Sequence, residues 1–341
     1  MTIPHISCSL KALHLFFPTL TASTAMISVL DIIEKGTTYL ESKGIDEARR
    51  NMQLLVTHQL GCSKVELYMQ FDRLMADDEL TPLREKLKRR GSGEPLQHIL
   101  GSVEFFRRDF KTDSRALIPR PETEELASII LNLDLPASLN LLDMGTGSGV
   151  LGLTLAAELG GKCHCATLAD VSHDALALAE ENKNLLGLGR VELLWSDLFS
   201  KLEDRKYHLI VANLPYISDA DEQTLSSEVQ RDPPLALFGG KDGLDILREF
   251  INQAPLHLHP GGIIALEIGY DQAEAVETML GDNEFIDIKT HNDLSGVARF
   301  PIAKLPGTPP PTDQAEDSEE SKDSEELQAD TNQQSHSADY S

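Results

Sequence analysis

Between residues 139 and 303, short apolar runs alternate with segments of helical periodicity. The runs LNLLDMG, CHCATLAD, VELLWSD, YHLIVAN and GGIIALEIG are typical of strands, whereas GVLGLTLAAEL and HDALALAEENKNLLG have helical spacing. Because parallel strands need long crossover connections, this alternation predicts an α/β fold with a mostly parallel sheet covered on both faces. Two final runs, FIDIKTHND and GVARFPIA, have no helix between them. They bring the expected number of strands to seven and predict an antiparallel edge.

A helical region is expected before the sheet. Over residues 26–92, apolar side chains recur at helical spacing, and we expect an amphipathic helix that opens at Met26. Residues 93–115 include the extended run VEFFRRDFKT, which predicts a β-hairpin linker. The main domain is expected over residues 116–305. Its first helix should open at Pro121, because proline and the acidic residues after it suit the first turn of a helix.

The two ends of the chain differ in composition from the rest. Residues 1–25 include the apolar run LHLFFPTL, but the run is short and contains a proline. We therefore expect an extension that is disordered or follows a misassigned start, rather than a secretion signal. Residues 306–341 are rich in Pro, Asp, Glu, Ser and Gln, which predicts an acidic disordered tail. We find no segment long enough to span a bilayer.

Charge and cysteine content narrow the functional classes. The formal net charge is −25. Residues 306–341 hold ten acidic residues and one lysine, so the rest of the chain carries about −16. This balance argues against a broad nucleic-acid-binding surface. The four cysteines form no CxxC pair and have no zinc-like spacing with histidine. We expect no metal site and reduced thiols, and hence a cytoplasmic protein.

A glycine-rich loop follows the first expected strand of the sheet. Gly145, Gly147 and Gly149 alternate with Thr146 and Ser148 before a helix begins. Glycines let the backbone approach a ligand closely, and the helix start offers free N–H groups. The spacing G-x-G-x-G differs from the dinucleotide motif G-x-G-x-x-G, and no Lys-Ser/Thr follows as in a P-loop.

Two further strands of the expected sheet end in acidic residues. Asp170 closes the run TLAD, and Asp197 follows the run VELLW. Ligands of open α/β sheets bind outside the carboxyl ends of the strands, where an acid can accept hydrogen bonds from ribose hydroxyls. The glycine loop and the two acids together predict a site for a nucleoside-type cofactor, with Asp170 at the ribose and Asp197 near the base.

The fourth strand of the expected sheet runs into Asn213, Leu214, Pro215 and Tyr216. Asparagine and proline are common in turns, so this order is compatible with a simple turn. Its position beside the glycine loop favours a second interpretation, a pocket that holds a planar NH2 group.

The combination of glycine loop, strand-end acids and NLPY resembles the class I S-adenosylmethionine-dependent methyltransferases. With LIPRPETEEL, SSEVQRDPPLALFGGKDGLDILREFI and ALEIGYDQ added, the chain looks like the release-factor glutamine methyltransferase family of the HemK/PrmC type. The likeness runs from about Met26 to Lys304. It implies a Rossmann-like methyltransferase domain, S-adenosyl-L-methionine as cofactor, and methylation of the glutamine N5 in the Gly-Gly-Gln motif of class 1 peptide-chain release factors. Translation termination is the process it would support.

The resemblance also implies roles for individual residues. In the catalytic motif, the Asn213 side chain and the carbonyl of residue 214 would hold the two amide N–H bonds, Pro215 would stiffen the loop, and Tyr216 would pack against the substrate. The family usually has proline where Leu214 stands, and we expect only the backbone carbonyl to matter there. The same four residues are also expected to bind the substrate. The implied cofactor-binding residues are Gly145, Thr146, Gly147, Ser148, Gly149, Asp170, Asp197, Leu198 and Asn213. The further substrate-binding residues are Arg120, Glu122 and Glu228.

Three other functions compete with this interpretation. A ribosomal-protein glutamine N5-methyltransferase would share nearly all the motifs. An adenine N6 nucleic-acid methyltransferase would use NLPY to hold an exocyclic NH2 group. A non-catalytic binding module with a relic fold is contradicted by the intact glycine loop, Asp170 and Asn213. The expected partners are release factors, with no stable nucleic acid and no membrane, and we expect a monomer.

Overall fold

The computed structural model describes residues 26–226 and 228–307. The expectations for residues 1–25 and 308–341 lie outside the described residues. Within the described part of the chain, no helix is both long enough and apolar enough to cross a membrane.

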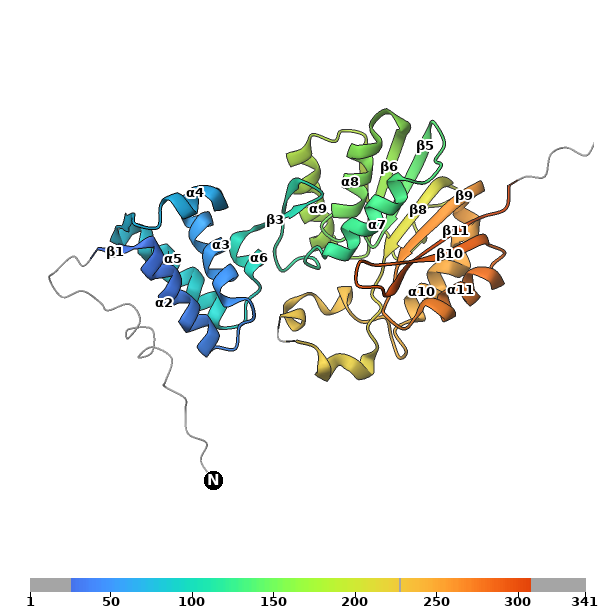
Figure 1. Cartoon of the computed structure of the whole chain (residues 1–341). Coiled ribbons are helices and arrows are strands. Elements are labelled where there is room, and N and C mark those ends of the chain that lie inside the picture. Colours follow the sequence, from blue (N-terminus) through green and yellow to red (C-terminus); the bar gives the residue numbers. More distant parts are fainter. Residues whose placement is uncertain (1–25, 227, 308–341) are drawn as a thin grey trace, which may run out of the picture. The chain divides into compact units, whose positions relative to one another are not determined.

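The N-terminal region is a small helical domain with its own apolar core (Figure 1). Its first helix begins at Val29 rather than at Met26, because the Ser28 hydroxyl caps it and accepts a 3.2 Å hydrogen bond from the Asp31 N–H. Ser28 and the preceding Ile27 form one strand of a two-stranded sheet. The elements of this domain are β1 (Ile27–Ser28), α2 (Val29–Ser42), α3 (Ala48–Leu60), α4 (Lys64–Met69), β2 (Leu74–Met75) and α5 (Asp77–Gly91).

A short helix and a hairpin connect this region to the main domain. The hairpin pairs β3 (Ser102–Phe105) with β4 (Arg108–Lys111) in antiparallel register. Phe106 and Arg107 between them both have positive φ, which matches the twist of a tight two-residue turn. The short helix α6 (Leu96–Leu100) lies within the segment that the sequence predicted only as a hairpin linker.

The main domain is built on one seven-stranded sheet, as the sequence predicted. Its order is β10-β11-β9-β8-β5-β6-β7. Strand β11 pairs antiparallel with both of its neighbours, β10 and β9, and all other neighbouring strands are parallel. From β5 the chain adds β6 and β7 on one side and then returns to add β8 on the other side of β5. The strand order therefore reverses between β5 and β8, and such a switch point is where open α/β sheets bind ligands. The strands are β5 (Leu139–Met144), β6 (Cys163–Asp170), β7 (Val191–Trp195), β8 (Tyr207–Asn213), β9 (Leu258–Glu267), β10 (Ile286–Asn292) and β11 (Ala298–Lys304).

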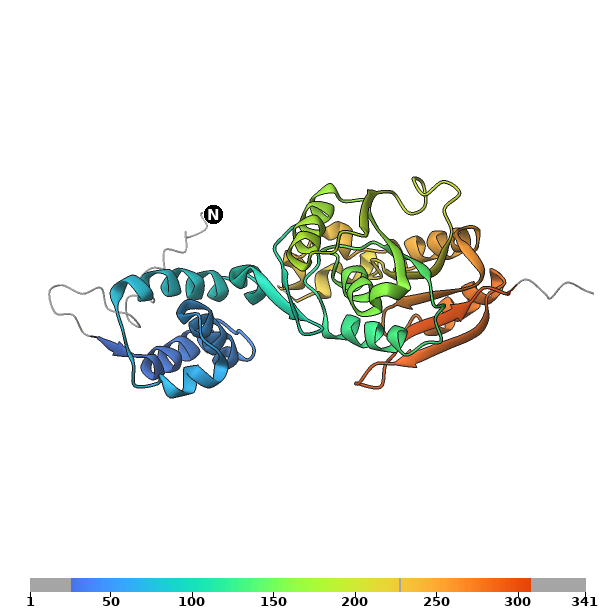
Figure 2. The same ribbon diagram turned by 90° about the horizontal axis from the view of Figure 1, so that it is seen from above.

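Helices cover both faces of the sheet (Figures 1 and 2). Successive strand residues point to opposite faces, so Leu209 and Val211 of β8 belong to one core cluster and Ile210 and Ala212 to the other. The first cluster includes α7 (Pro121–Leu131) and α8 (Val150–Leu159), and the second includes α10 (Asp245–Gln253) and α11 (Ala273–Asp282). The remaining helices are α9 (His173–Leu186), η1 (Gly160–Lys162), η2 (Asp219–Thr224), η3 (Val229–Arg231), η4 (Pro234–Ala236) and η5 (Ala254–His257).

Candidate active site

A cavity of about 380 Å³ opens at the carboxyl ends of the parallel strands. This is where the topology of an open α/β sheet places ligands. The lining residues come from the loop before α7, the first turn of α7, the glycine loop after β5, the segments at the ends of β6, β7 and β8, the η4 segment and α10. The predicted site residues in its wall are Arg120, Gly145, Thr146, Gly147, Ser148, Asp170, Asp197, Leu198, Asn213, Leu214 and Pro215.

The glycine loop takes backbone conformations that other residues rarely adopt. Gly145, Gly147 and Gly149 have φ of 71°, 57° and 85°. Gly149 is not part of the cavity wall, and a Cβ there would lie 2.8 Å from a methyl group of Leu153. Gly149 is therefore needed for close packing, whereas Gly145 and Gly147 face the ligand space.

Asp143 holds the glycine loop from behind. It is buried, and its Oδ2 accepts hydrogen bonds from the Thr146 hydroxyl at 2.5 Å and the Gly152 N–H at 2.9 Å. The carboxylate thus joins the loop to the first turns of α8. No site role was assigned to Asp143 from the sequence, although it lies at a strand end like Asp170.

Burial raises the pKa of Asp143 to about 6, although its hydrogen bonds from Thr146 and Gly152 lower it. An aspartate in the unfolded chain has a pKa of about 3.9. The folded state therefore keeps a proton that the unfolded chain has lost, and the contribution of Asp143 to stability falls as the pH rises from about 4 to about 6. Asp143→Asn keeps an oxygen for both hydrogen bonds but does not titrate.

We therefore expect the stability of the wild type relative to Asp143→Asn to fall by on the order of 2 kcal/mol between pH 4 and pH 7. Denaturant unfolding of both proteins across this range measures the difference. A stability difference between the two proteins that stays constant with pH would contradict a raised pKa for Asp143.

Asp170 lies where the sequence placed it, at the end of β6. Its two oxygens accept 2.8 Å hydrogen bonds from the N–H groups of Gly147 and Ser172. Each carboxylate oxygen has a second lone pair, so acceptor capacity for two hydroxyl groups remains. Asp197 is exposed and lies two residues beyond the end of β7. Both acids border the cavity, and their contact with a ribose and a base stays a prediction.

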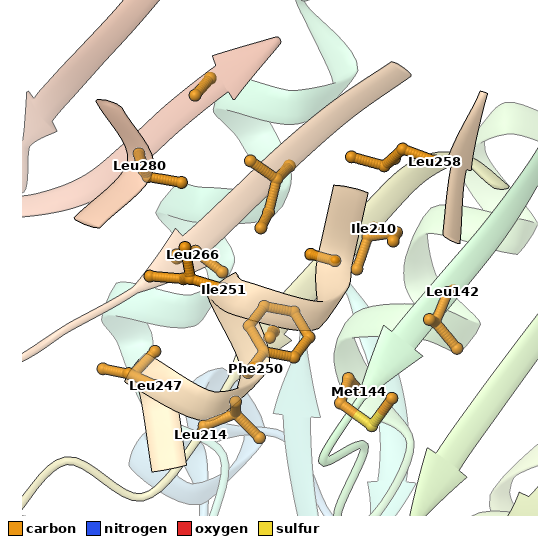
Figure 3. Packing of buried hydrophobic residues seen from close by; sticks show 14 of the residues in the cluster. Leu142, Met144, Ile210, Leu214, Leu247, Phe250, Ile251, Leu258, Leu266 and Leu280 are labelled. Carbon is orange, nitrogen blue, oxygen red and sulfur yellow. The ribbon is translucent and has the colours of Figure 1, made fainter. Parts of the chain in front are cut away.

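Asn213 is the last residue of β8, and its neighbour Leu214 packs tightly beneath the glycine loop. The Leu214 side chain is 4% exposed and belongs to the core cluster that includes Met144, Leu247 and Phe250 (Figure 3). A Cβ built on Gly145 would lie only 2.7 Å from the Leu214 Cδ2 atom. The leucine side chain therefore has a packing role that the sequence interpretation did not give it.

Two residues beside Asn213 received no role from the sequence. Thr123, in the first turn of α7, donates a 2.7 Å hydrogen bond to the Oε2 atom of Glu267 and accepts a 3.3 Å hydrogen bond from the Asn213 Nδ2 atom. Glu267 ends β9, and the strand register places it beside Asn213. A lone acid at the end of the apolar run GGIIALEIG is the same signal that identified Asp170 and could have identified Glu267.

Besides Gly149, three predicted residues are not part of the cavity wall: Tyr216, Glu122 and Glu228. Tyr216 packs against the core cluster, and burial, together with the charge of Glu267, raises its pKa to about 12. Glu228 accepts a hydrogen bond from Arg90, the buried arginine of α5. The substrate roles of these residues stay predictions.

Arg120 is held in place by a buried acid. Its Nη2 atom donates a 2.7 Å hydrogen bond to Asp232, whose other oxygen accepts a bond from the Ile118 N–H at 3.3 Å. The Asp232 side chain is fully buried, so the pair ties the segment after Glu228 to the loop before α7.

The residues around the cavity fit S-adenosylmethionine. The hydroxyl of Ser148 is buried in the glycine loop and has no hydrogen-bond partner among the described residues, so it is available to a polar ligand. The positive-φ glycines leave room for a ligand against the backbone, and Asp170 offers acceptors for hydroxyl groups. When bound, the cofactor supplies an electrophilic methyl group.

The fold and the cavity define a class I S-adenosylmethionine-dependent methyltransferase. A release factor glutamine methyltransferase of Geobacter sulfurreducens is 39% identical over 263 residues, which cover 76% of this chain and 91% of that protein. One of Koribacter versatilis is 36% identical over 272 residues, covering 79% and 95%. The chain belongs to the release factor glutamine methyltransferase family.

Other comparisons match parts of the chain. Residues 31–101 match the family model of the PrmC N-terminal domain, and residues 125–231 match the methyltransferase small domain. The solved structure of a ribosomal protein L11 methylase from Lactobacillus delbrueckii subsp. bulgaricus has a TM-score of 0.43 at 25% identity, covering 57% of this chain and 84% of that one. A methyltransferase from Pyrococcus furiosus has a TM-score of 0.45 at 19% identity, covering 60% and 91%. Likeness at this level has no bearing on the substrate.

Proposed function

We propose that this chain transfers a methyl group from S-adenosylmethionine to the side-chain N5 of the glutamine in the Gly-Gly-Gln motif of class 1 peptide-chain release factors. The curated relatives are named for this substrate class. The observation that carries the chemical argument is the position of Asn213, at the end of β8, in the cavity wall, with its amide nitrogen turned to Thr123.

An amide nitrogen is a poor nucleophile because its lone pair is delocalised into the carbonyl group. The protein must therefore orient this nitrogen and exclude water. With the Asn213 nitrogen bonded to Thr123, the Asn213 oxygen is left to accept one N–H bond of the substrate. The carbonyl of Leu214 would accept the other. Two fixed acceptors stabilise the charge that builds on the nitrogen without reorganising during the reaction.

The loop that supplies these acceptors is held from both sides. The Leu214 side chain fixes it to the core, and Pro215 limits its backbone freedom. The Gln272 amide donates hydrogen bonds to the carbonyls of Tyr216 at 3.0 Å and Gly243 at 3.3 Å. This bracing supports the accurate placement that methyl transfer to a weak nucleophile needs.

The segment that contains Glu228 and Asp232 is proposed to form one side of the groove for the protein substrate. Its ion pairs with Arg90 and Arg120 support a defined conformation for it. The described cysteines are free thiols, which supports action in the reducing cytoplasm, where release factors function. We propose that the chain acts as a monomer.

The test uses the full chain, labelled S-adenosylmethionine and a purified release factor. We expect label on the intact factor and no label when the glutamine of its Gly-Gly-Gln motif is replaced by alanine. Label that persists on the replaced factor would contradict the proposal.

An adenine N6-methyltransferase is the second candidate, because the order Asn213-Leu214-Pro215-Tyr216 also suits an exocyclic NH2 group. The charge of about −16 outside residues 306–341 argues against it. Parallel reactions with ribosomal RNA and with ribosomal protein separate the alternatives. Label on RNA, or faster labelling of ribosomal protein than of the release factor, would replace the proposed substrate.

A further inference from the structure

Glu267, Thr123 and Asn213 form a chain of side chains that runs from behind the cavity to its wall. They come from the ends of two neighbouring parallel strands, β9 and β8, and from the first turn of α7. Glu267 is 1% exposed and Thr123 is 4% exposed, so water does not compete strongly for their hydrogen bonds. Asn213 is half-buried, and both it and Thr123 border the cavity, whereas Glu267 does not.

The direction of the hydrogen bonds follows from the number of protons available. A threonine hydroxyl has one proton, and Thr123 donates it to Glu267 at 2.7 Å. Thr123 can then only accept from Asn213, and this bond requires the Asn213 NH2 group at 3.3 Å. The Asn213 oxygen must consequently face away from Thr123. If the amide turned over, its NH2 group would meet the NH2 group of an incoming glutamine, which offers no hydrogen bond.

We propose that Glu267 and Thr123 are positioning residues that hold the Asn213 amide with its oxygen available to the methyl acceptor. This inference rests on the proposed function and adds two residues to its machinery. Neither residue needs to touch the substrate. Each acts through the orientation of Asn213.

The protonation state of Glu267 would control the direction of this chain. Burial raises the pKa of Glu267 to about 7, whereas hydrogen bonds from Thr123 and Asn213 and the charge of Arg299 on β11 lower it. Glu122 on α7 raises it further, and the buried phenol of Tyr216 also interacts with this carboxyl. A protonated Glu267 could donate to Thr123, which could then donate to the Asn213 oxygen and turn the amide over. We therefore expect kcat to fall as the pH is lowered below about 7, and Glu267→Gln to flatten this dependence.

Paired variants of Thr123 test the inference. Thr123→Val keeps the shape but removes the hydroxyl, whereas Thr123→Ser keeps the hydroxyl. We expect kcat to fall about 10-fold or more in Thr123→Val, to stay within about 3-fold of wild type in Thr123→Ser, and cofactor affinity to be unchanged in both. In an Asn213→Ala background, Thr123→Val should cost less than about 2-fold, because its effect passes through Asn213. An equal loss in both backgrounds would overturn the inference.

A second readout does not need a substrate. The side-chain amide signals of Asn213 in a ¹⁵N-labelled full chain can be assigned by their loss in Asn213→Ala. We expect them to shift with pH in the wild type and to lose this response in Glu267→Gln. If they respond identically in both proteins, the inference fails even when the enzyme is active. If the wild type does not methylate a release factor, the proposed function fails, and these signals still decide the role of Glu267.

Discussion

Asn213→Ala should lower kcat for release-factor methylation by about 10²- to 10³-fold while the Kd for S-adenosylmethionine stays within about 3-fold of wild type. The alanine removes one of two fixed acceptors that orient the substrate nitrogen. The cofactor keeps the glycine loop, which follows β5, and Asp170, which ends β6, and neither belongs to β8. Single-turnover rates and calorimetric titration with the cofactor measure the two quantities separately.

Asn184→Ala is the matched control for this substitution. Asn184 is an exposed asparagine of α9 whose amide donates a 3.3 Å hydrogen bond to a neighbouring surface glutamate, Glu180. It should leave kcat and Kd unchanged. The role of Asn213 would be refuted by a variant that retained full turnover, or by one whose loss came entirely from weaker cofactor binding.

Gly145→Ala should weaken S-adenosylmethionine binding by about 100-fold. Gly145 has a φ of 71°, a conformation that costs an alanine about 1–2 kcal/mol. The added Cβ would lie 2.7 Å from Leu214 Cδ2, and Leu214 is too tightly packed to move without further cost of about 1–3 kcal/mol. The free loop is expected to shift to relieve this cost, and cofactor binding must then restore its conformation, so a combined cost near 3 kcal/mol corresponds to about two powers of ten in affinity. Because Leu214 adjoins Asn213, kcat should fall as well.

Gly187→Ala separates backbone strain from the steric contact. Gly187 ends α9 with a φ of 67°, and a Cβ there would meet no atom within 4 Å. This variant should lose stability but bind the cofactor normally. Equal cofactor binding by Gly145→Ala and wild type in calorimetry would show that the glycine loop does not approach the ligand as we describe.

Most of the fold could be predicted because the apolar runs of the sheet are well separated by glycines and acids. The antiparallel edge followed from the missing helix between β10 and β11. The sequence did not predict two local features, the start of the first helix and the short helix α6. The Ser28 cap starts the first helix at Val29, and the five-residue helix α6 is too short to show a helical period.

The cavity wall could be predicted where one residue type at a strand end carries the signal, as with Asp170 and Asn213. Contacts between segments that are distant in the sequence could not be predicted. Thr123 and Glu267 are separated by 144 positions and meet only when α7 packs over the end of β9. The pairing of Arg120 with Asp232 likewise depends on a loop conformation that no local pattern encodes. The packing of Leu214 against Gly145 has the same origin, since no local pattern links the loop after β5 to the residue that follows β8.

The measurement that tests the central claim most directly is tandem mass spectrometry of a release factor after incubation with the full chain and S-adenosylmethionine. We predict one added methyl group, located on the side-chain nitrogen of the glutamine in the Gly-Gly-Gln motif and absent when Asn213→Ala replaces the wild type for the same short time. A methyl group on another residue of the factor, or an unmodified factor beside an active control enzyme, would contradict it.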